Sequence, residues 1–153
     1  MLVLYEKKQI SQKLKNIDFI DDGKFLIMKI YLSVHTYIFE LFNKCTCCEQ
    51  TYMTIEDYET LSELDEEDIE ETKDIVSKFL NKEVNEIIVK EIPIIDNTFT
   101  IRMVIYFDDE EKSTLSLSMN NQHDGYYPHS VTLELENENE NENGNELLFK
   151  TYI

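Results

Sequence analysis

The sequence predicts an α+β fold: an antiparallel sheet of about five to seven strands, with one main helix packed on one face. Three observations lead to it. In the second half of the chain, apolar and polar residues alternate with period two, as in half-buried strands. Residues 62–80 instead place apolar side chains at helical spacing. The length of 153 residues suits one ordinary domain, so residues 1–153 are treated as a single domain.

The first 42 residues are predicted to form a short helix followed by a β-hairpin. Residues 6–17 carry apolar side chains at intervals of four and three, which is typical of one helix face. Those side chains are Ile10, Leu14 and Ile17. Residues 21–23, Asp-Asp-Gly, predict a turn, because glycine tolerates positive φ and aspartate bonds nearby backbone amides. The alternation in 25–33 and 35–42 then predicts two paired strands.

A helix is predicted over residues 62–80, and it would be the main helix of the fold. Ser62, followed three positions later by Asp65, resembles a capping-box start. Acidic residues crowd the first turns, and Lys78 and Lys82 follow in the last, an order that suits the helix dipole. The apolar stripe consists of Ile69, Thr72, Val76, Phe79 and Leu80.

Strands return after the helix. Residues 85–91 predict a strand, which Pro93 either ends or places at a sheet edge. Period-two alternation predicts three more strands over 99–107, 114–119 and 131–135. Because they follow one another at short spacing, we expect an antiparallel meander with one buried face.

The C-terminal region combines a polar tract with an apolar end. Residues 137–146 are an Asn/Glu-rich tract with no apolar side chain to bury, so a flexible loop is predicted. Residues 147–153 are apolar again and are predicted to pair with 131–136 as the last strand. The tract would then be a long hairpin loop within the domain.

The formal net charge of −18 is concentrated in two segments. Residues 49–74 hold twelve acids and one base, and residues 134–146 hold six acids and no base. The rest of the chain is nearly neutral. We expect no direct binding of nucleic acid, because no cluster of Lys and Arg could neutralise phosphates.

Composition also indicates a compartment. No apolar run approaches the roughly 18 to 20 residues of a membrane-spanning helix, so we expect no membrane partner. The three cysteines, Cys45, Cys47 and Cys48, form an odd and tightly bunched set, which favours a reducing intracellular setting over a disulfide framework. The predicted location is intracellular, in a host cytoplasm or a virion.

The cysteines could serve an enzyme in two ways, as metal ligands or as a nucleophile. Three thiols with His35, His123 and His129 suggest zinc, but C-x-C-C lacks the C-x2-C spacing that lets two sulfurs face one ion, so no metal or other cofactor is expected. A nucleophilic cysteine needs a neighbouring base or positive field, and the acids that follow the cluster disfavour a thiolate. We therefore expect a protein that is not an enzyme, with a metal-dependent or cysteine enzyme as an alternative.

The best candidate site combines two polar signatures that each follow a predicted strand. In Gly125-Tyr126-Tyr127-Pro128, the glycine supplies an unusual backbone conformation that positions two aromatic rings. The rings could close one end of the core, or they could form a polar and aromatic rim that holds a ligand or a partner's side chain. The predicted rim residues are Cys47, Cys48, Glu49, His123, Asp124, Tyr126 and Tyr127.

The same signatures resemble a family of small uncharacterised domains of phages and large DNA viruses, including giant viruses. Cys47-Cys48-Glu49 follows a strand pair, and Asp124-Gly125-Tyr126-Tyr127 follows a later strand. The resemblance covers roughly residues 20–135. The chain departs from the family at Asn81, where a glycine is expected, and at Asp124, where the family has asparagine. The resemblance implies a viral domain and supplies no settled activity.

The sequence therefore predicts a non-enzymatic, intracellular viral accessory protein that acts by binding a protein or a small ligand. A second hypothesis is an acidic mimic of nucleic acid, which inhibits a host factor that binds DNA or RNA. Helix capping and solubility explain the acids more simply, because most of them crowd one helix and its approach. The identity of the partner and the oligomeric state stay open.

Overall fold

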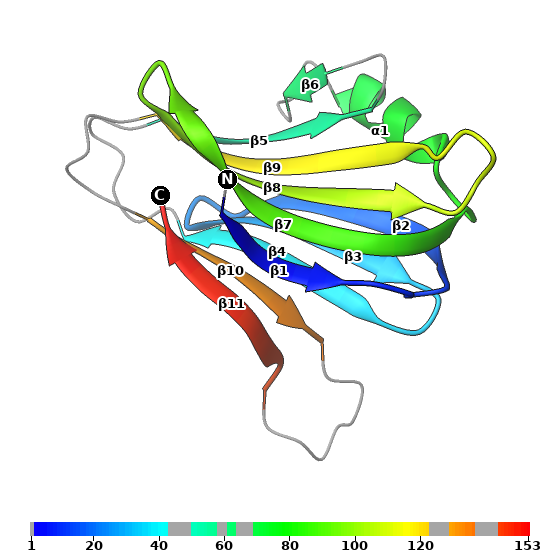
Figure 1. The fold of residues 1–153 in the computed structure, drawn as a ribbon. Coiled ribbons are helices and arrows are strands. Elements are labelled where there is room, and N and C mark those ends of the chain that lie inside the picture. The colour runs from blue at the N-terminus through cyan, green and yellow to red at the C-terminus, as the bar shows by residue number, and fades with distance from the viewer. Residues whose placement is uncertain (1, 43–49, 58–60, 64–68, 123–128, 137–143) are drawn as a thin grey trace.

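Antiparallel β-strands make up nearly all of the fold (Figure 1). The computed structural model describes residues 2–42, 50–57, 61–63, 69–122, 129–136 and 144–153. Among them are one helix, α1 (Ile69–Ser77), and eleven strands. The strands are β1 (Val3–Lys7), β2 (Gln12–Asp21), β3 (Phe25–Leu32), β4 (Thr36–Phe42), β5 (Gln50–Glu56), β6 (Leu61–Glu63), β7 (Glu83–Ile95), β8 (Thr98–Phe107), β9 (Thr114–Gln122), β10 (Ser130–Leu135) and β11 (Glu146–Tyr152).

The strands form one continuous sheet that turns a corner. Its order is β11-β10-β4-β3-β2-β7-β8-β9-β5-β6, and β1 pairs with β7. At the corner, Gln12 and Lys13 of β2 lie opposite Val84 and Glu83 of β7. We call β1, β7, β8, β9, β5 and β6 half-sheet A, and β2, β3, β4, β10 and β11 half-sheet B.

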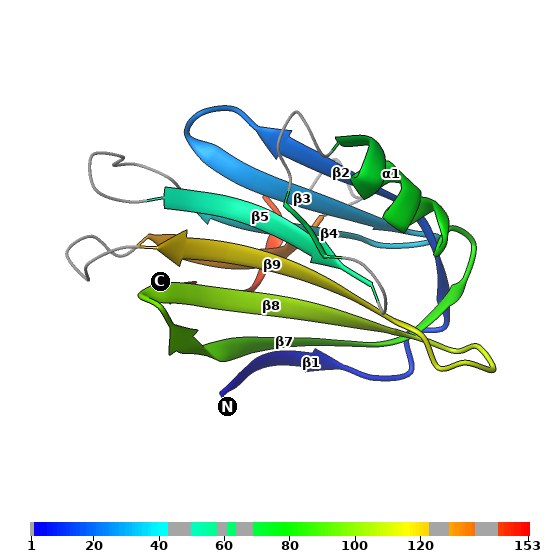
Figure 2. The same cartoon turned by 90° about the horizontal axis from the view of Figure 1, so that it is seen from above.

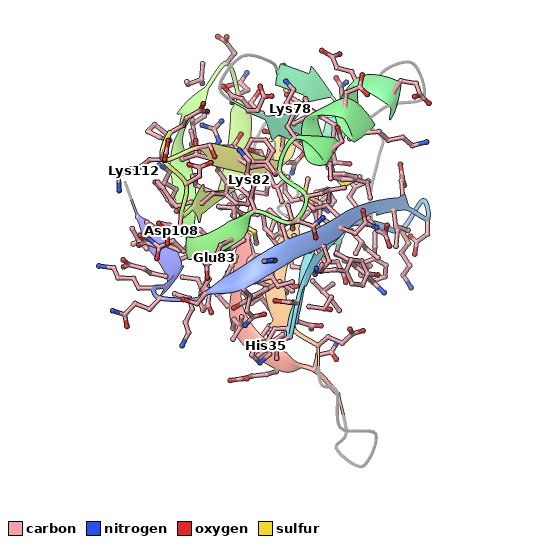
Figure 3. The ribbon with its side chains drawn as sticks, turned by 90° about the vertical axis from the view of Figure 1, so that its right-hand side faces the viewer. His35, Lys78, Lys82, Glu83, Asp108 and Lys112 are labelled. Atoms are coloured by element: carbon pink, nitrogen blue, oxygen red, sulfur yellow. The ribbon has the colours of Figure 1, made fainter. Side chains whose placement is uncertain are left out.

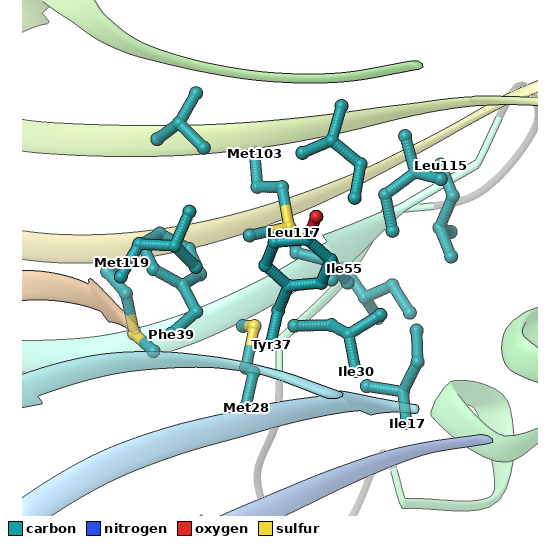
Figure 4. Packing of buried hydrophobic residues seen from close by; sticks show 14 of the residues in the cluster. Ile17, Met28, Ile30, Tyr37, Phe39, Ile55, Met103, Leu115, Leu117 and Met119 are labelled. Atoms are coloured by element: carbon teal, nitrogen blue, oxygen red, sulfur yellow. The ribbon is translucent and has the colours of Figure 1, made fainter. Parts of the chain in front are cut away.

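The two half-sheets pack face to face as a β-sandwich, as the two views in Figures 1 and 2 show. Figure 4 shows their side chains meeting in the middle, with Met28 and Phe39 from half-sheet B toward Met103 and Leu117 from half-sheet A. All four are fully buried. Each half-sheet thus covers the apolar face of the other.

The predicted α+β fold class is wrong, because the structure is almost entirely β and has one helix of nine residues among the described part of the chain. Helix α1 does not cover a sheet face. It lies next to β5 and β6, at one edge of half-sheet A (Figure 2). The alternating strands indicated a buried face correctly, but the second half-sheet covers that face instead of a helix.

The helix predicted over residues 6–17 is also wrong, since this region contains β1, a connection and β2. Leu14 and Ile17 are both buried although they are three residues apart, because the pairing of β2 with β3 shifts register between Leu14 and Asn16. Such a bulge adds one residue to a strand and resets its alternation. The resulting spacing of three resembles helical spacing.

The main helix is shorter than predicted. Ser62 lies in β6, so it does not cap the helix, and the acids at 65–68 lie outside the described residues. Lys78 and Lys82 follow the end of α1, whose last turn contains no basic residue. Burial confirms Thr72, Val76 and Phe79 in the predicted stripe and adds Ile75, whereas Leu80 is 38% exposed and does not belong to it.

Local predictions around the hairpins hold. β3 and β4 pair along their length, as predicted. The turn at 21–23 has Gly23 at φ +83°, and the Asp22 Oδ1 atom accepts bonds from the amides of Lys24 (2.9 Å) and Phe25 (2.7 Å). These bonds lower the pKa of the Asp22 carboxyl. β10 and β11 also pair as predicted, with the Asn/Glu tract between them, of which 137–143 lie outside the described residues.

The predicted three-strand meander is wrong in its last strand. β8 and β9 form a hairpin, but β10 pairs with β4 in half-sheet B, and β9 pairs with β5. Pro93 does not end β7, which continues to Ile95. It lies beyond the stretch that β1 covers and next to a register shift in the β7–β8 pair, so it occupies an edge position, as the second alternative predicted.

No helix in the described part of the chain has the length and apolar character needed to cross a membrane.

Candidate binding surface

The predicted rim falls outside the part of the chain that the structure describes. This applies to all seven residues: Cys47, Cys48, Glu49, His123, Asp124, Tyr126 and Tyr127. The strand ends that flank the two signatures are described. Gln50 begins β5, Gln122 ends β9, and the two are register partners in half-sheet A. The two signatures are thus attached to the sheet at neighbouring strand ends, and the rim itself stays a prediction.

Both signature-bearing segments connect the two half-sheets. Residues 43–49 join β4 to β5, and residues 123–128 lead from β9 toward β10. In half-sheet B their attachment points also lie close together, because Leu41 of β4 is the register partner of Val131 of β10. We call this end of the sandwich the signature end.

Two adjacent hydrogen-bonded sets of polar side chains lie on the outer face of half-sheet A near the signature end. We call them together the polar ladder, which consists of Thr54, Thr100, Arg102, Ser118 and Asn120. The Thr100 hydroxyl lies 2.8 Å from Asn120 Oδ1, and Asn120 Nδ2 donates to Thr54 Oγ1 (3.2 Å) and to the Tyr52 carbonyl (3.3 Å). Arg102 Nε donates to Ser118 Oγ (3.1 Å).

The alternation of β9 explains why these side chains face outward. Leu115, Leu117 and Met119 point into the sandwich, so Ser118 and Asn120 must lie on the opposite face. Thr100 and Asn120 are register partners, as are Arg102 and Ser118. Thr100, Ser118 and Asn120 are each less than 10% exposed. Mutual hydrogen bonds and close packing hold the ladder in one arrangement.

The next residue of β9 is Asn121, whose polar side chain lies on the side of the strand that faces the core. It is fully buried, and its Nδ2 donates to the Ile153 carbonyl (3.0 Å). Ile153 also exchanges two backbone bonds with His129, at 2.7 and 2.8 Å. Asn121 therefore ties the end of β9 to the end of half-sheet B. Its Oδ1 has no partner among the described residues, which costs about 1–3 kcal/mol.

The opposite end of the molecule carries polar groups with structural roles (Figure 3). Gln12 bonds the His35 ring (2.8 Å) and accepts from the His35 amide (3.0 Å), which holds the β3–β4 turn. Asp109 accepts from the Ser113 hydroxyl and amide and from Lys82 Nζ (3.1 Å). These bonds, chiefly those from Ser113, lower the pKa of Asp109 to about 2.

The histidines considered for zinc do not come together. β4 and β10 are antiparallel, with Tyr37 opposite Leu135 and Leu41 opposite Val131, so His35 and His129 lie at opposite ends of this pair. Six residues of strand separate those ends by roughly 20 Å, too far for one ion. Within the described ranges, no group of three or more His, Cys, Asp or Glu residues could hold a metal ion. The cysteines and His123 lie outside those ranges.

Sequence reasoning missed the polar ladder. The sequence does carry a signal, because polar residues occupy alternate positions 116, 118 and 120, but alternation alone does not show that such side chains bond to one another across strands. Their side chains become neighbours through the pairing of β8, β9 and β5, of which β5 lies far away in the sequence. No protein-family model, no curated protein and no solved structure matches this chain.

Proposed function

We propose that this chain is a non-enzymatic binding protein that holds a partner protein on the outer face of half-sheet A, next to the signature end. The observation that carries the proposal is the polar ladder. The resemblance of the two signatures to domains of phages and large DNA viruses is the reason to propose a viral accessory role in an intracellular setting.

The ladder suits binding because its side chains are ordered before a partner arrives. Ordering a rotamer-rich side chain at an interface costs roughly 0.5–1.5 kcal/mol, and a side chain already held by neighbours avoids most of this cost. The bonds of Thr100, Asn120 and Thr54 supply that order. The ladder also adjoins two connecting segments, and connections on a rigid scaffold are where proteins most often place recognition residues.

The shape of the surface favours a protein partner over a small ligand. The ladder runs over three adjacent strands, β8, β9 and β5, a width of roughly 10 Å between the outer strand axes. The ladder is spread across a sheet face, whereas small ligands are usually enclosed in concave sites.

The proposal is tested by comparing partner capture between matched variants. The double variant Thr54→Val and Thr100→Val removes two ladder hydroxyls with little change in shape. We expect it to bind the captured partner about tenfold more weakly, because Asn120 loses its bonds to the two hydroxyls and the ladder is no longer held in one arrangement. Circular dichroism and thermal unfolding establish that the variant is folded.

Two control variants separate this proposal from the alternatives. Glu70→Gln with Glu71→Gln neutralises exposed acids on α1, and we expect full partner binding. Loss of binding in this variant, with retention in the ladder variant, would favour the nucleic-acid mimic instead. Tyr126→Ala with Tyr127→Ala tests the predicted rim, and weaker binding is expected there too. If neither the ladder variant nor the tyrosine variant weakens capture, the proposed surface is wrong.

A further inference from the structure

Arg102 stands out from the other basic residues of the chain. Thirteen of the fourteen basic residues are lysines, and Arg102 is the single arginine. It lies in the middle of β8, on the outer face of half-sheet A, and is half-buried. Arginine differs from lysine in its planar fork of donors, which matches two oxygens of one acceptor group at once.

Among the described residues, the strand positions around Arg102 hold no acid. Its register partners are Lys90 on β7 and Ser118 on β9, and its neighbours along β8 on the same face are Thr100 and Val104. The four diagonal positions are Ile88, Ile92, Ser116 and Asn120. Although the chain has 32 acidic residues, these positions hold one further positive charge, that of Lys90, and no negative charge. Among the described residues, the next acids on this face lie beyond these positions: Glu86 on β7, Glu6 opposite Ile88, Glu56 opposite Ser116, and Glu63 opposite Thr54.

The guanidinium of Arg102 is oriented but only partly used. Its Nε donates to Ser118 Oγ (3.1 Å), which leaves the four N–H groups on the two Nη atoms. The ion pairs between described residues are made by lysines, namely Lys8, Lys73, Lys78 and Lys82. Among those residues, no acid is paired with Arg102. A half-buried arginine held in one orientation without a counter-charge is suited to an external anion.

We infer that Arg102 is a binding residue for a carboxylate group of a partner protein, an Asp or Glu side chain that accepts two bonds from its Nη atoms. Lys90 adds charge on one side, and the hydroxyl of Thr100 lies on the same face. The inference rests on the proposed function and names the chemistry of the partner. A carboxylate is favoured over a phosphate group because the protein carries a net charge of −18, which repels a dianion more than a monoanion.

The test exploits the single arginine, because the side-chain Nε–Hε signal of Arg102 is unique in a ¹⁵N-resolved NMR spectrum. The full chain is titrated at constant ionic strength with N-acetyl-glutamate methylamide and, as a matched probe, N-acetyl-glutamine methylamide. We expect a saturable shift of the Arg102 signal with the glutamate probe and none with the glutamine probe. Inorganic phosphate is titrated in the same way.

Two variants test whether binding of the glutamate probe depends on the paired N–H donors of the Arg102 guanidinium and on their orientation. The backbone amide signals of Thr100 and Ser118 are the readout. Arg102→Lys keeps the charge and is expected to bind the glutamate probe about tenfold more weakly, because a lysine cannot make the paired bonds. Ser118→Ala keeps the guanidinium, releases its Nε, and is expected to weaken binding about threefold. Lys29→Gln, on half-sheet B, should change nothing.

The inference is overturned if the glutamate and glutamine probes shift the signal equally, if Arg102→Lys binds as tightly as the unmodified chain, or if phosphate saturates the site and the glutamate probe does not. Its failure can be told apart from failure of the proposed function. A partner captured equally well by Arg102→Lys but lost by the Thr54→Val and Thr100→Val variant refutes the role of Arg102 and leaves the binding surface in place.

Discussion

Folding disfavours the ionised form of the Glu40 carboxyl. It lies on the outer face of β4, opposite Thr132 and Ile27. Burial raises the pKa of its carboxyl, and the nearby carboxylates of Glu134 and Asp22 raise it further. In the unfolded chain these influences are lost, so the folded protein binds the proton more tightly. Stability therefore falls as the pH rises from the unfolded pKa through the raised folded pKa.

Replacing Glu40 with glutamine should stabilise the protein at neutral pH. The change Glu40→Gln keeps the shape of the side chain and removes the unfavourable charge, so we expect a higher urea midpoint at pH 7. At a pH below the unfolded pKa, where Glu40 is protonated in both states, the gain should vanish. Glu111→Gln, at an exposed position, is the control. An equal gain at both pH values would contradict the electrostatic explanation.

Asn81 illustrates how one backbone angle limits the choice of residue. It follows the end of α1 with φ +67°, and its amide donates to the Leu14 carbonyl (2.7 Å). Asparagine tolerates this left-handed region better than most residues, and glycine tolerates it best. The angle at residue 81 is one that glycine adopts without strain.

We expect Asn81→Ala to cost about 1 kcal/mol of unfolding free energy, because alanine keeps the Cβ that is strained at this angle and lacks the amide group that lets asparagine tolerate it. Asn81→Gly should stay within about 0.5 kcal/mol of the unmodified chain. Both variants lose the exposed bond from Lys15 Nζ (3.1 Å), so their difference isolates the backbone effect. Urea denaturation measures it. Equal stability of the two variants would argue against a strained angle at residue 81.

At the scale of elements, α1 and the turn that follows it seal one edge of the sandwich. Ile75 and Val76 are buried, and Phe79, just past the helix, stacks on Phe107 with ring centroids 4.9 Å apart. Leu80, the next residue, is 38% exposed. Phe79 is therefore buried in the core, whereas Leu80, its neighbour in the sequence, is partly exposed.

Phe79→Ala should destabilise the protein by about 3–5 kcal/mol, the usual cost of truncating a buried phenylalanine. Leu80→Ala is the matched control, and we expect it to cost about 1 kcal/mol, because Leu80 is 38% exposed and buries less apolar surface than Phe79. Thermal and urea unfolding of the two variants provide the measurement. If the two changes cost the same, the contact between Phe79 and Phe107 is not the main seal.

Across the whole molecule, stability should follow the position of a strand in its sheet. β8 lies between β7 and β9 and contributes Ile101, Met103 and Ile105 to the core. β11 has β10 as its paired strand in the described part of the chain, and Leu147 and Tyr152 are exposed. Edge strands open in small local motions, whereas central strands open mainly in global unfolding.

Amide hydrogen exchange followed by mass spectrometry should therefore show the slowest exchange in the central residues of β8. Peptides covering β1 and β11 should exchange several orders of magnitude faster, because they open locally. Uniform protection of all strands would mean that the two half-sheets open only as one unit. Faster exchange in β8 than in β11 would contradict the observed strand order.

The candidate site could be predicted only in part from the sequence. The two signatures were expected to lie at neighbouring corners, and the pairing of Gln50 with Gln122 places their attachment points side by side, while the rim residues lie outside the described chain. No sequence pattern identified Arg102 or Thr54 as candidate site residues. Their significance comes from strands that are distant along the chain.

The sequence by itself determined the local features of this protein: the turn at Gly23, the β3–β4 and β8–β9 hairpins, and the pairing of β10 with β11. Each depends on side-chain alternation and turn chemistry between close neighbours. Tertiary structure alone decided that β10 joins β4, that β5 joins β9, and that a second half-sheet covers the apolar face. Alternation shows which side of a strand is apolar, but it carries no information about which distant surface will bury that side.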